Sequence, residues 1–200
     1  SQAGRGCSVA DFAGDIAGLI RRLRLDRPVV VGHSLGAMVA IELAARQPEL
    51  IGRLVLLAGT LKPDFALDHP LLASIQALRD PISPADPFYV GWHACRPGVP
   101  RPFLAGMAKD ASAMPAARWR AVLEEIRLAD LTSAARAVCA PTLIIAGACD
   151  PLFGEAHQQA LSRALPHASL VQVEGCGHNL HWEDPAYIAE AIAGMVAYLD

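Results

Sequence analysis

Residues 27–58 read RPVVVGHSLGAMVAIELAARQPELIGRLVLLA, and this stretch decides the fold. It opens with the β-branched run Val29–Val31, which predicts a short buried strand. An Ala-rich helical segment follows a tight turn and ends before Pro48. A second apolar run, Leu54–Leu57, predicts another buried strand. Strand, turn, helix and strand in this order indicate a βαβ unit with parallel strands.

The turn itself reads Gly32-His33-Ser34-Leu35-Gly36, a Gly-x-Ser-x-Gly motif. In this motif, the nucleophile elbow, the serine sits on a strained turn that projects its hydroxyl above the sheet edge. We expect a Cβ at either glycine to meet the neighbouring strand or helix. An ordinary βαβ crossover with two turn glycines is the plainer interpretation. A dinucleotide-binding turn fits poorly, because Ser34 stands where that motif has its second glycine.

Composition narrows the class of protein. Two hundred residues, of which 53% are hydrophobic, suit one domain or one domain with an insertion. The net charge of −3 and the scattered arginines give no case for a nucleic-acid partner. No apolar run approaches the roughly 18 residues of a membrane span. The five cysteines are irregularly spaced, which predicts neither a disulfide framework nor a metal site and favours a reducing, cytoplasmic location.

The pattern changes between residues 60 and 138, where strand signals vanish and prolines separate short helical pieces. We predict that residues 60–137 form a mostly helical cap, and that residues 1–59 and 138–200 form the core. The core pattern returns with a buried strand at Pro141–Gly147 and a short strand at Leu170–Val173. Strands that alternate with helices predict an α/β fold with a parallel sheet.

Ser34, Asp150 and His178 each follow the carboxyl end of a predicted strand, where parallel α/β sheets bind ligands. A serine hydroxyl is a poor nucleophile at neutral pH, so it needs a base such as His178 within hydrogen-bond reach. Asp150 would orient the imidazole, and the backbone N–H of Leu35 would stabilise an oxyanion. Asp64 is the rival acid; we favour Asp150 because a strand-Gly-x-x-Asp pattern places its carboxylate closer to a strand end.

The wall of a substrate pocket is harder to predict. His33 adjoins the nucleophile, but we expect its ring to point away from the reaction. Trp92, Phe103 and Trp119 in the cap are further candidates, with packing inside the cap as the alternative for Trp119. The remaining histidines are expected to be surface or cap residues; they are His69, His93, His157, His167 and His181.

In four segments the chain resembles the α/β-hydrolase family, especially its branch of small-molecule esterases, lactonases, C–C bond hydrolases and cofactor-free haloperoxidase-like enzymes. The segments are GRGCS (4–8), VVVGHSLGAMVA (29–40), PTLIIAGACDP (141–151) and GCGHNLHWEDP (175–185). The order Ser, Asp, His is that of the family. The resemblance implies a cofactor-free serine hydrolase that cleaves small, fairly apolar esters through an acyl-enzyme. The alternatives are a hydrolase-fold receptor that binds a ligand with slow turnover, and a C–C bond hydrolase or haloperoxidase-like enzyme.

The sequence departs from the family at its start. Members of the family begin with about four more strands and a His-Gly loop that supplies the second oxyanion donor. We therefore expect a separate N-terminal segment or chain to complete the sheet. The strand at Val29–Val31 is expected to be fully buried, because in the family's sheet it pairs with a strand on each side. In this sequence we expect Leu54–Leu57 on one side, while the strand for the other side is one that the sequence lacks.

Overall fold

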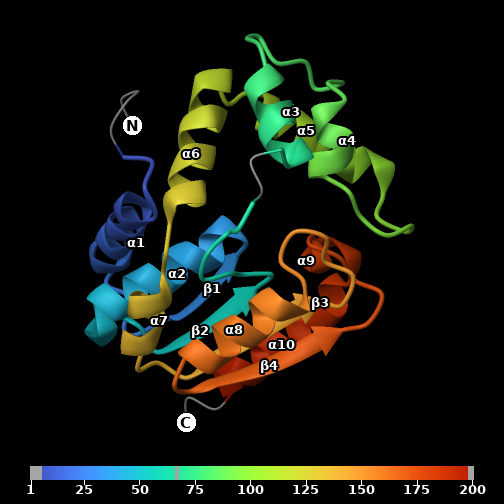
Figure 1. Cartoon of the computed structure of the whole chain (residues 1–200). Coiled ribbons are helices and arrows are strands. Elements are labelled where there is room, and N and C mark those ends of the chain that lie inside the picture. The colour runs from blue at the N-terminus through green and yellow to red at the C-terminus, as the bar shows by residue number, and fades with distance from the viewer. Residues whose placement is uncertain (1–5, 66–67, 198–200) are drawn as a thin grey trace.

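The computed structural model describes residues 6–65 and 68–197 of the chain (Figure 1). Its strands and helices alternate along both flanks of the sequence, while the middle is helical. In chain order the elements are α1 (Val9–Leu23), β1 (Val29–His33), α2 (Leu35–Arg46), the 3₁₀ turn η1 (Pro48–Leu50), β2 (Arg53–Leu57), α3 (Pro70–Ala77), α4 (Phe88–Trp92), α5 (Arg101–Ser112), α6 (Ala116–Leu128), α7 (Thr132–Ala137), β3 (Thr142–Gly147), α8 (Glu155–Ala164), β4 (Ala168–Val173), α9 (Leu180–Glu183) and α10 (Pro185–Ala197).

The strands in the described part of the chain form one parallel sheet in the order β1-β2-β3-β4. This confirms the predicted parallel α/β fold. β2 lies inside the sheet and its side chains alternate between two buried faces. Leu54 and Leu56 pack in one hydrophobic cluster, while Val55 and Leu57 pack in another on the opposite face. A strand buried on both faces needs apolar residues at every position, which explains its continuous apolar run.

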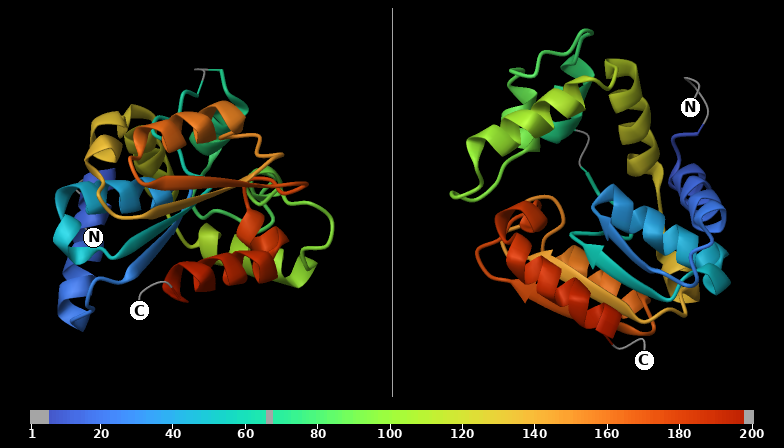
Figure 2. Two further views of the ribbon diagram at one scale, coloured as in Figure 1. Left: turned by 90° about the horizontal axis from the view of Figure 1, so that it is seen from below. Right: turned by 180° about the vertical axis from the view of Figure 1, so that it is seen from behind.

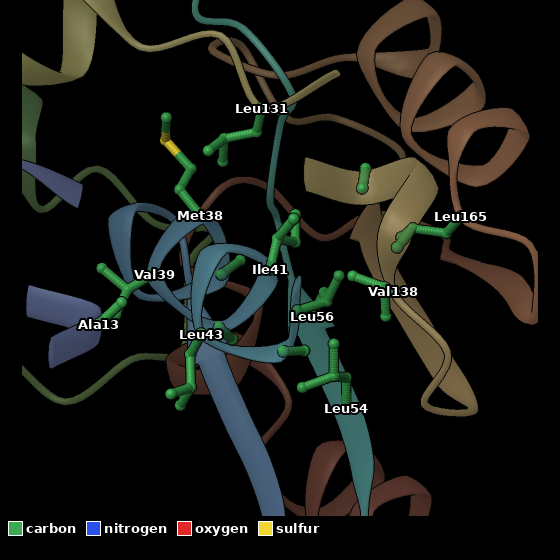
Figure 3. Close-up of a cluster of buried hydrophobic side chains, with 14 of the residues drawn as sticks. Ala13, Met38, Val39, Ile41, Leu43, Leu54, Leu56, Leu131, Val138 and Leu165 are labelled. Carbon is green, nitrogen blue, oxygen red and sulfur yellow. The ribbon is translucent and has the colours of Figure 1, made fainter. Parts of the chain in front are cut away.

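Helices cover both faces of the sheet, as the view from below shows (Figure 2). α2 and α8 pack on one face with α7 against both of them, α1 packs against α2, and α10 lies on the opposite face. The larger cluster of apolar side chains fills the space between the sheet and α2 (Figure 3). Met38, Ile41, Leu54 and Leu56 in this cluster are fully buried. None of the helices in the described ranges is both long and apolar enough to cross a bilayer.

β1 differs from its expectation. Val29 and Val30 are only half-buried, and Val31 is 42% exposed, so the predicted full burial was wrong, whereas the predicted pairing with the Leu54–Leu57 strand is confirmed. The reason is the position of β1 in the sheet, because among the described residues it pairs with β2 alone and lies at the edge. Its β-branched residues reflect strand propensity as well as burial.

The helices α3 to α7 all lie between β2 and β3 in sequence. Figure 1 shows α3, α4 and α5 grouped at one end of the molecule, with α6 running back toward α7. Side chains of α3 to α6 share a separate hydrophobic cluster that includes Ile75, Phe88, Trp119 and Leu123. Ala135 of α7 instead belongs to the larger cluster beneath α2. The middle of the chain therefore has its own small core, and its last helix packs on the sheet.

Gly147 at the end of β3 lets two loops approach each other. A Cβ at this position would lie 2.2 Å from the carbonyl oxygen of Gly177 and 2.4 Å from that of Cys176. Next to it, the N–H of Cys149 donates a hydrogen bond to the carbonyl of Cys176 at 2.8 Å. The loop after β3 and the loop after β4 are thus in backbone contact, which only a residue without a side chain permits here.

We predict that Gly147→Ala lowers the free energy of unfolding by at least about 2 kcal/mol, because the new methyl group meets backbone that cannot move aside cheaply. Gly194→Ala in α10 is the matched control, since a Cβ there meets nothing within 4 Å. That change should stabilise the protein by about 0.5–1 kcal/mol, as alanine favours a helix over glycine. Urea titration of both variants measures the difference. Equal stability of the two would contradict the close approach at Gly147.

Candidate active site

Ser34 lies on the turn between β1 and α2 with strained backbone angles, φ 52° and ψ −116°. Its N–H donates to the carbonyl of Leu57 at 2.9 Å, which ties the turn to β2. A Cβ at Gly32 would lie 2.2 Å from the carbonyl oxygen of Gly36, so Gly32 must be glycine. The same expectation was wrong for Gly36, where a Cβ would meet nothing within 4 Å. In this turn Gly36 contributes the backbone that crowds Gly32.

A continuous chain of hydrogen bonds joins the ends of three strands. The Nε2 atom of His178 lies 2.9 Å from the Oγ atom of Ser34, and its Nδ1 atom lies 2.9 Å from the Oδ2 atom of Asp150. Because a carboxylate only accepts, Nδ1 carries the proton, which leaves Nε2 free to accept from the serine hydroxyl. Ser34 follows β1, Asp150 follows β3 and His178 follows β4, and these parallel strands end at one edge of the sheet.

Two backbone N–H groups fix the carboxylate of Asp150 in position for its contact with His178. The side chain of Asp150 is fully buried, and its Oδ1 atom accepts hydrogen bonds from the N–H groups of Leu152 and Phe153 at 2.8 and 3.1 Å. Burial raises the pKa of Asp150, but the hydrogen bond and charge of His178 and these two N–H groups outweigh it, so the pKa lies below its usual value. The rival acid, Asp64, is exposed and has no hydrogen bond to His178.

Two further histidines lie next to His178: His33 packs against it, and His181 packs against His33. The Nε2–H group of His33 donates to the backbone carbonyl of His178 at 2.8 Å, and its ring centroid lies 4.2 Å from that of His181. Burial, and then the charge that His181 and His178 would carry, lower the pKa of His33 to about 3. Burial also lowers the pKa of His181 to about 4. Both rings are therefore neutral at pH 7.

The position of His181 corrects one expectation about the histidines. His181, expected at the surface or in the cap, lies beside His33 at the candidate site. His93 lies in the cap region as expected, where it is 8% exposed and stacks on Tyr89. The sequence carried no signal for His181, because its contact with His33 joins residues far apart in the chain.

Ser34 and His178 open onto a cavity of about 1100 Å³ between the core and the cap. Its walls are mostly apolar, with core side chains such as Met38 on one side and cap side chains on the other. Trp92 and Trp119 line it, and both also pack in the small core of the cap. Phe103 does not line the cavity. This residue is 38% exposed, and the centroid of its ring lies 5.5 Å from that of Trp182.

Among the residues that the structure describes, the charged ones on the cavity wall are Arg96 and Glu183, which sequence reasoning missed. Their partners are backbone groups and the neighbouring Asp184, and such contacts leave no pattern in a sequence. Within residues 6–65 and 68–197, no three His, Cys, Asp or Glu side chains are grouped so that they could hold a metal ion.

The neutral histidines make a prediction about pH. The unfolded chain takes up a proton on each near pH 6.5, whereas folded His33 and His181 take one up only near pH 3 and 4. The unfolded state therefore binds more protons between these values, and the free energy of unfolding should fall as the pH is lowered from 6.5 to 4. The amide of His33→Gln can still donate to His178 but does not titrate. In this variant the slope of the unfolding free energy with pH should correspond to about one fewer proton taken up on unfolding.

Urea titration at several pH values measures this dependence for wild type and variant. His167→Gln, at an exposed position, is the control for loss of an imidazole. If wild type and His33→Gln show the same slope, His33 is not held neutral in the folded protein.

Known proteins resemble this chain over nearly its whole length. The 2-(acetamidomethylene)succinate hydrolase of Mesorhizobium japonicum is 29% identical over an alignment of 202 positions. The alignment covers 96% of this chain and 72% of that protein. RutD of Klebsiella pneumoniae subsp. pneumoniae, provisionally assigned as a carbamate hydrolase, is 30% identical over 195 residues, which cover 90% of this chain and 69% of that protein.

Solved structures agree on the fold. The esterase EaEST of Exiguobacterium antarcticum superposes with a TM-score of 0.84 at 16% identity, over 96% of this chain and 75% of that one. The sequence profile of the alpha/beta hydrolase family matches residues 3–191. The chain is therefore a member of the alpha/beta hydrolase family.

Proposed function

We propose that this protein is a serine hydrolase that cleaves the acyl bond of small, mainly apolar esters, with Ser34 as nucleophile, His178 as general base and Asp150 as the residue that orients His178. The observation that carries the proposal is the chain of two 2.9 Å hydrogen bonds that ends at the serine on the cavity wall. Nucleophile, base and orienting acid are then each within reach of the next.

The reaction follows from this order. Ser34 Oγ attacks the substrate carbonyl carbon as its proton passes to His178 Nε2. The bond from that carbon to the leaving oxygen breaks, and His178 returns the proton to the leaving alcohol, which leaves an acyl-serine. Water then attacks the acyl group, gives a proton to His178, and the acid is released as Ser34 regains its proton. Asp150 stabilises the imidazolium that forms in both halves.

The oxyanion of each tetrahedral intermediate needs hydrogen-bond donors. The N–H of Leu35, in the first turn of α2, is the donor we assign, because it follows the nucleophile directly. The first N–H groups of a helix have no partner within the helix, and the dipole of α2 favours negative charge at this end. The turn that strains the backbone of Ser34 also places the N–H of Leu35 at the start of α2.

The cavity wall supports a substrate that is largely apolar. Indole and phenyl rings of the cap face aliphatic side chains of the core, and a ligand buried among them gains from the loss of apolar surface from water. Because the cap contributes much of this wall, we propose that residues 60–137 set the choice of substrate.

Hydrolysis of a carbamate or an enamide is the second candidate. Two relatives at 29% and 30% identity carry names that state such substrates. The same triad would serve, with the proton of His178 passing to a leaving nitrogen or oxygen.

A receptor that keeps the triad but turns over slowly would be revealed by stoichiometric release of product without further cycles.

We predict that Ser34→Ala lowers kcat for nitrophenyl acetate about 10⁴-fold, because the nucleophile is lost while binding remains. Ser169→Ala, which changes an exposed serine on β4 away from the cavity, is the matched control and should stay within about twofold of wild type. Steady-state release of nitrophenol is the measurement, repeated with a nitrophenyl carbamate to compare the two substrate classes. If Ser34→Ala keeps more than a tenth of the activity, Ser34 is not the nucleophile.

We predict that Asp150→Asn lowers kcat about 10³- to 10⁴-fold, because an amide can present its NH₂ group to Nδ1 and favour the wrong tautomer of His178. Asp64→Asn, an equally conservative change at the exposed rival, should leave kcat unchanged. Thermal melts of both variants check that they remain folded. Comparable losses in the two would mean that Asp150 has no special role.

A further inference from the structure

We propose that Glu183 is a positioning residue that holds the loop carrying His178 against the cap, so that the catalytic histidine is aligned only while the cap is docked. This inference rests on the proposed role of His178 as general base. Two segments are involved: the histidine loop, residues 174–179 between β4 and α9, and the cap loop, residues 93–100 between α4 and α5.

The Glu183 carboxylate bridges the two loops directly. The residue is 8% exposed, Oε2 accepts the N–H of Gly177 at 2.6 Å, and Oε1 accepts the N–H of Arg96 at 3.1 Å. One oxygen therefore serves the histidine loop and the other serves the cap loop. A buried carboxylate is costly to desolvate, and these charge-assisted hydrogen bonds offset that penalty only while both loops are in place.

Other contacts join the same segments. The guanidinium of Arg96 donates to the carbonyl of Glu183 at 2.7 Å and lies 3.6 Å from the carboxylate of Asp184. The side-chain amide of Asn179 donates to the carbonyl of Ala94 at 3.2 Å. Ala94 and Arg96 of the cap loop are thus held to the segment that surrounds His178 by three hydrogen bonds and one ion pair.

These bonds restrain the peptide units on either side of the catalytic histidine. Glu183 fixes the N–H of Gly177, immediately before His178, and His33 fixes the carbonyl of His178 itself. The ring of His178 can then turn only about its own side-chain bonds, which keeps Nε2 directed at Ser34. If the cap loop moves away, one oxygen of Glu183 loses its partner, and the carboxylate is free to release Gly177.

A purely structural role would lower stability without changing the reaction at temperatures where the protein is folded. A positioning role acts on the chemical step, because misplacement of a reacting group by about 1 Å costs up to about a hundredfold in rate. It should therefore lower kcat and leave KM nearly unchanged. It should also loosen both loops together, since one carboxylate holds them both.

Glu183→Gln is the test, because glutamine keeps the volume but has a single acceptor oxygen for two N–H groups. Glu190→Gln, an exposed glutamate on α10, is the matched control. Well below the melting temperature of each variant, Glu183→Gln should lower kcat about tenfold or more and change KM less than about twofold. Amide hydrogen exchange should rise in peptides from both the cap loop and the histidine loop, and Glu190→Gln should change neither readout.

The inference is overturned if kcat of Glu183→Gln stays within twofold of wild type, or if exchange rises in only one of the two loops. Failure of the proposed function gives a different result, namely no turnover by wild type that depends on Ser34. In that case hydrogen exchange alone decides whether Glu183 couples the loops: a rise in both supports the coupling, and any other result rejects it.

Discussion

The hydrogen bond between His178 and Asp150 depends on the geometry of a parallel sheet and in turn gives the site its chemistry. β3 and β4 run side by side in the same direction, so the loops that follow them leave the sheet at the same edge. Gly147 lets these loops touch through their backbones, and the N–H groups of Leu152 and Phe153 fix the carboxylate. The 2.9 Å contact with Nδ1 then selects the tautomer whose Nε2 can accept the proton of Ser34.

Polar groups in the site are supported by backbone groups more than by other charges. The carboxylates of Asp150 and Glu183 each accept two backbone N–H groups, and His33 donates to a backbone carbonyl. Backbone donors are positioned by the fold itself and carry no side-chain entropy, so they can hold a buried carboxylate in one orientation. The site thereby combines an apolar cavity with a few fixed polar groups, an arrangement suited to a reaction in which charge develops at a carbonyl oxygen.

The cap and the sheet meet at this site although they have separate hydrophobic clusters. Apolar rings of the cap form one wall of the cavity, and residues 94–96 reach the segment around His178 through hydrogen bonds. A cap that only covered the pocket would need no such bonds. The two roles proposed for it, choice of substrate and support of the histidine loop, involve different residues and can be separated by mutation.

The parallel α/β fold and the order of the strands along the chain could be predicted from the sequence, because buried strands and amphipathic helices impose their periods on apolar residues. The sequence also identified Ser34, Asp150 and His178 as candidates, since each follows a strand and the turn around Ser34 needs Gly32. Other features could be seen only in the folded chain: the exposure of Val31, the absence of Phe103 from the cavity wall, and the places of His181 and Glu183. Those features depend on contacts between residues far apart in the chain, often with backbone atoms that every residue carries, and such contacts leave no local pattern to be read.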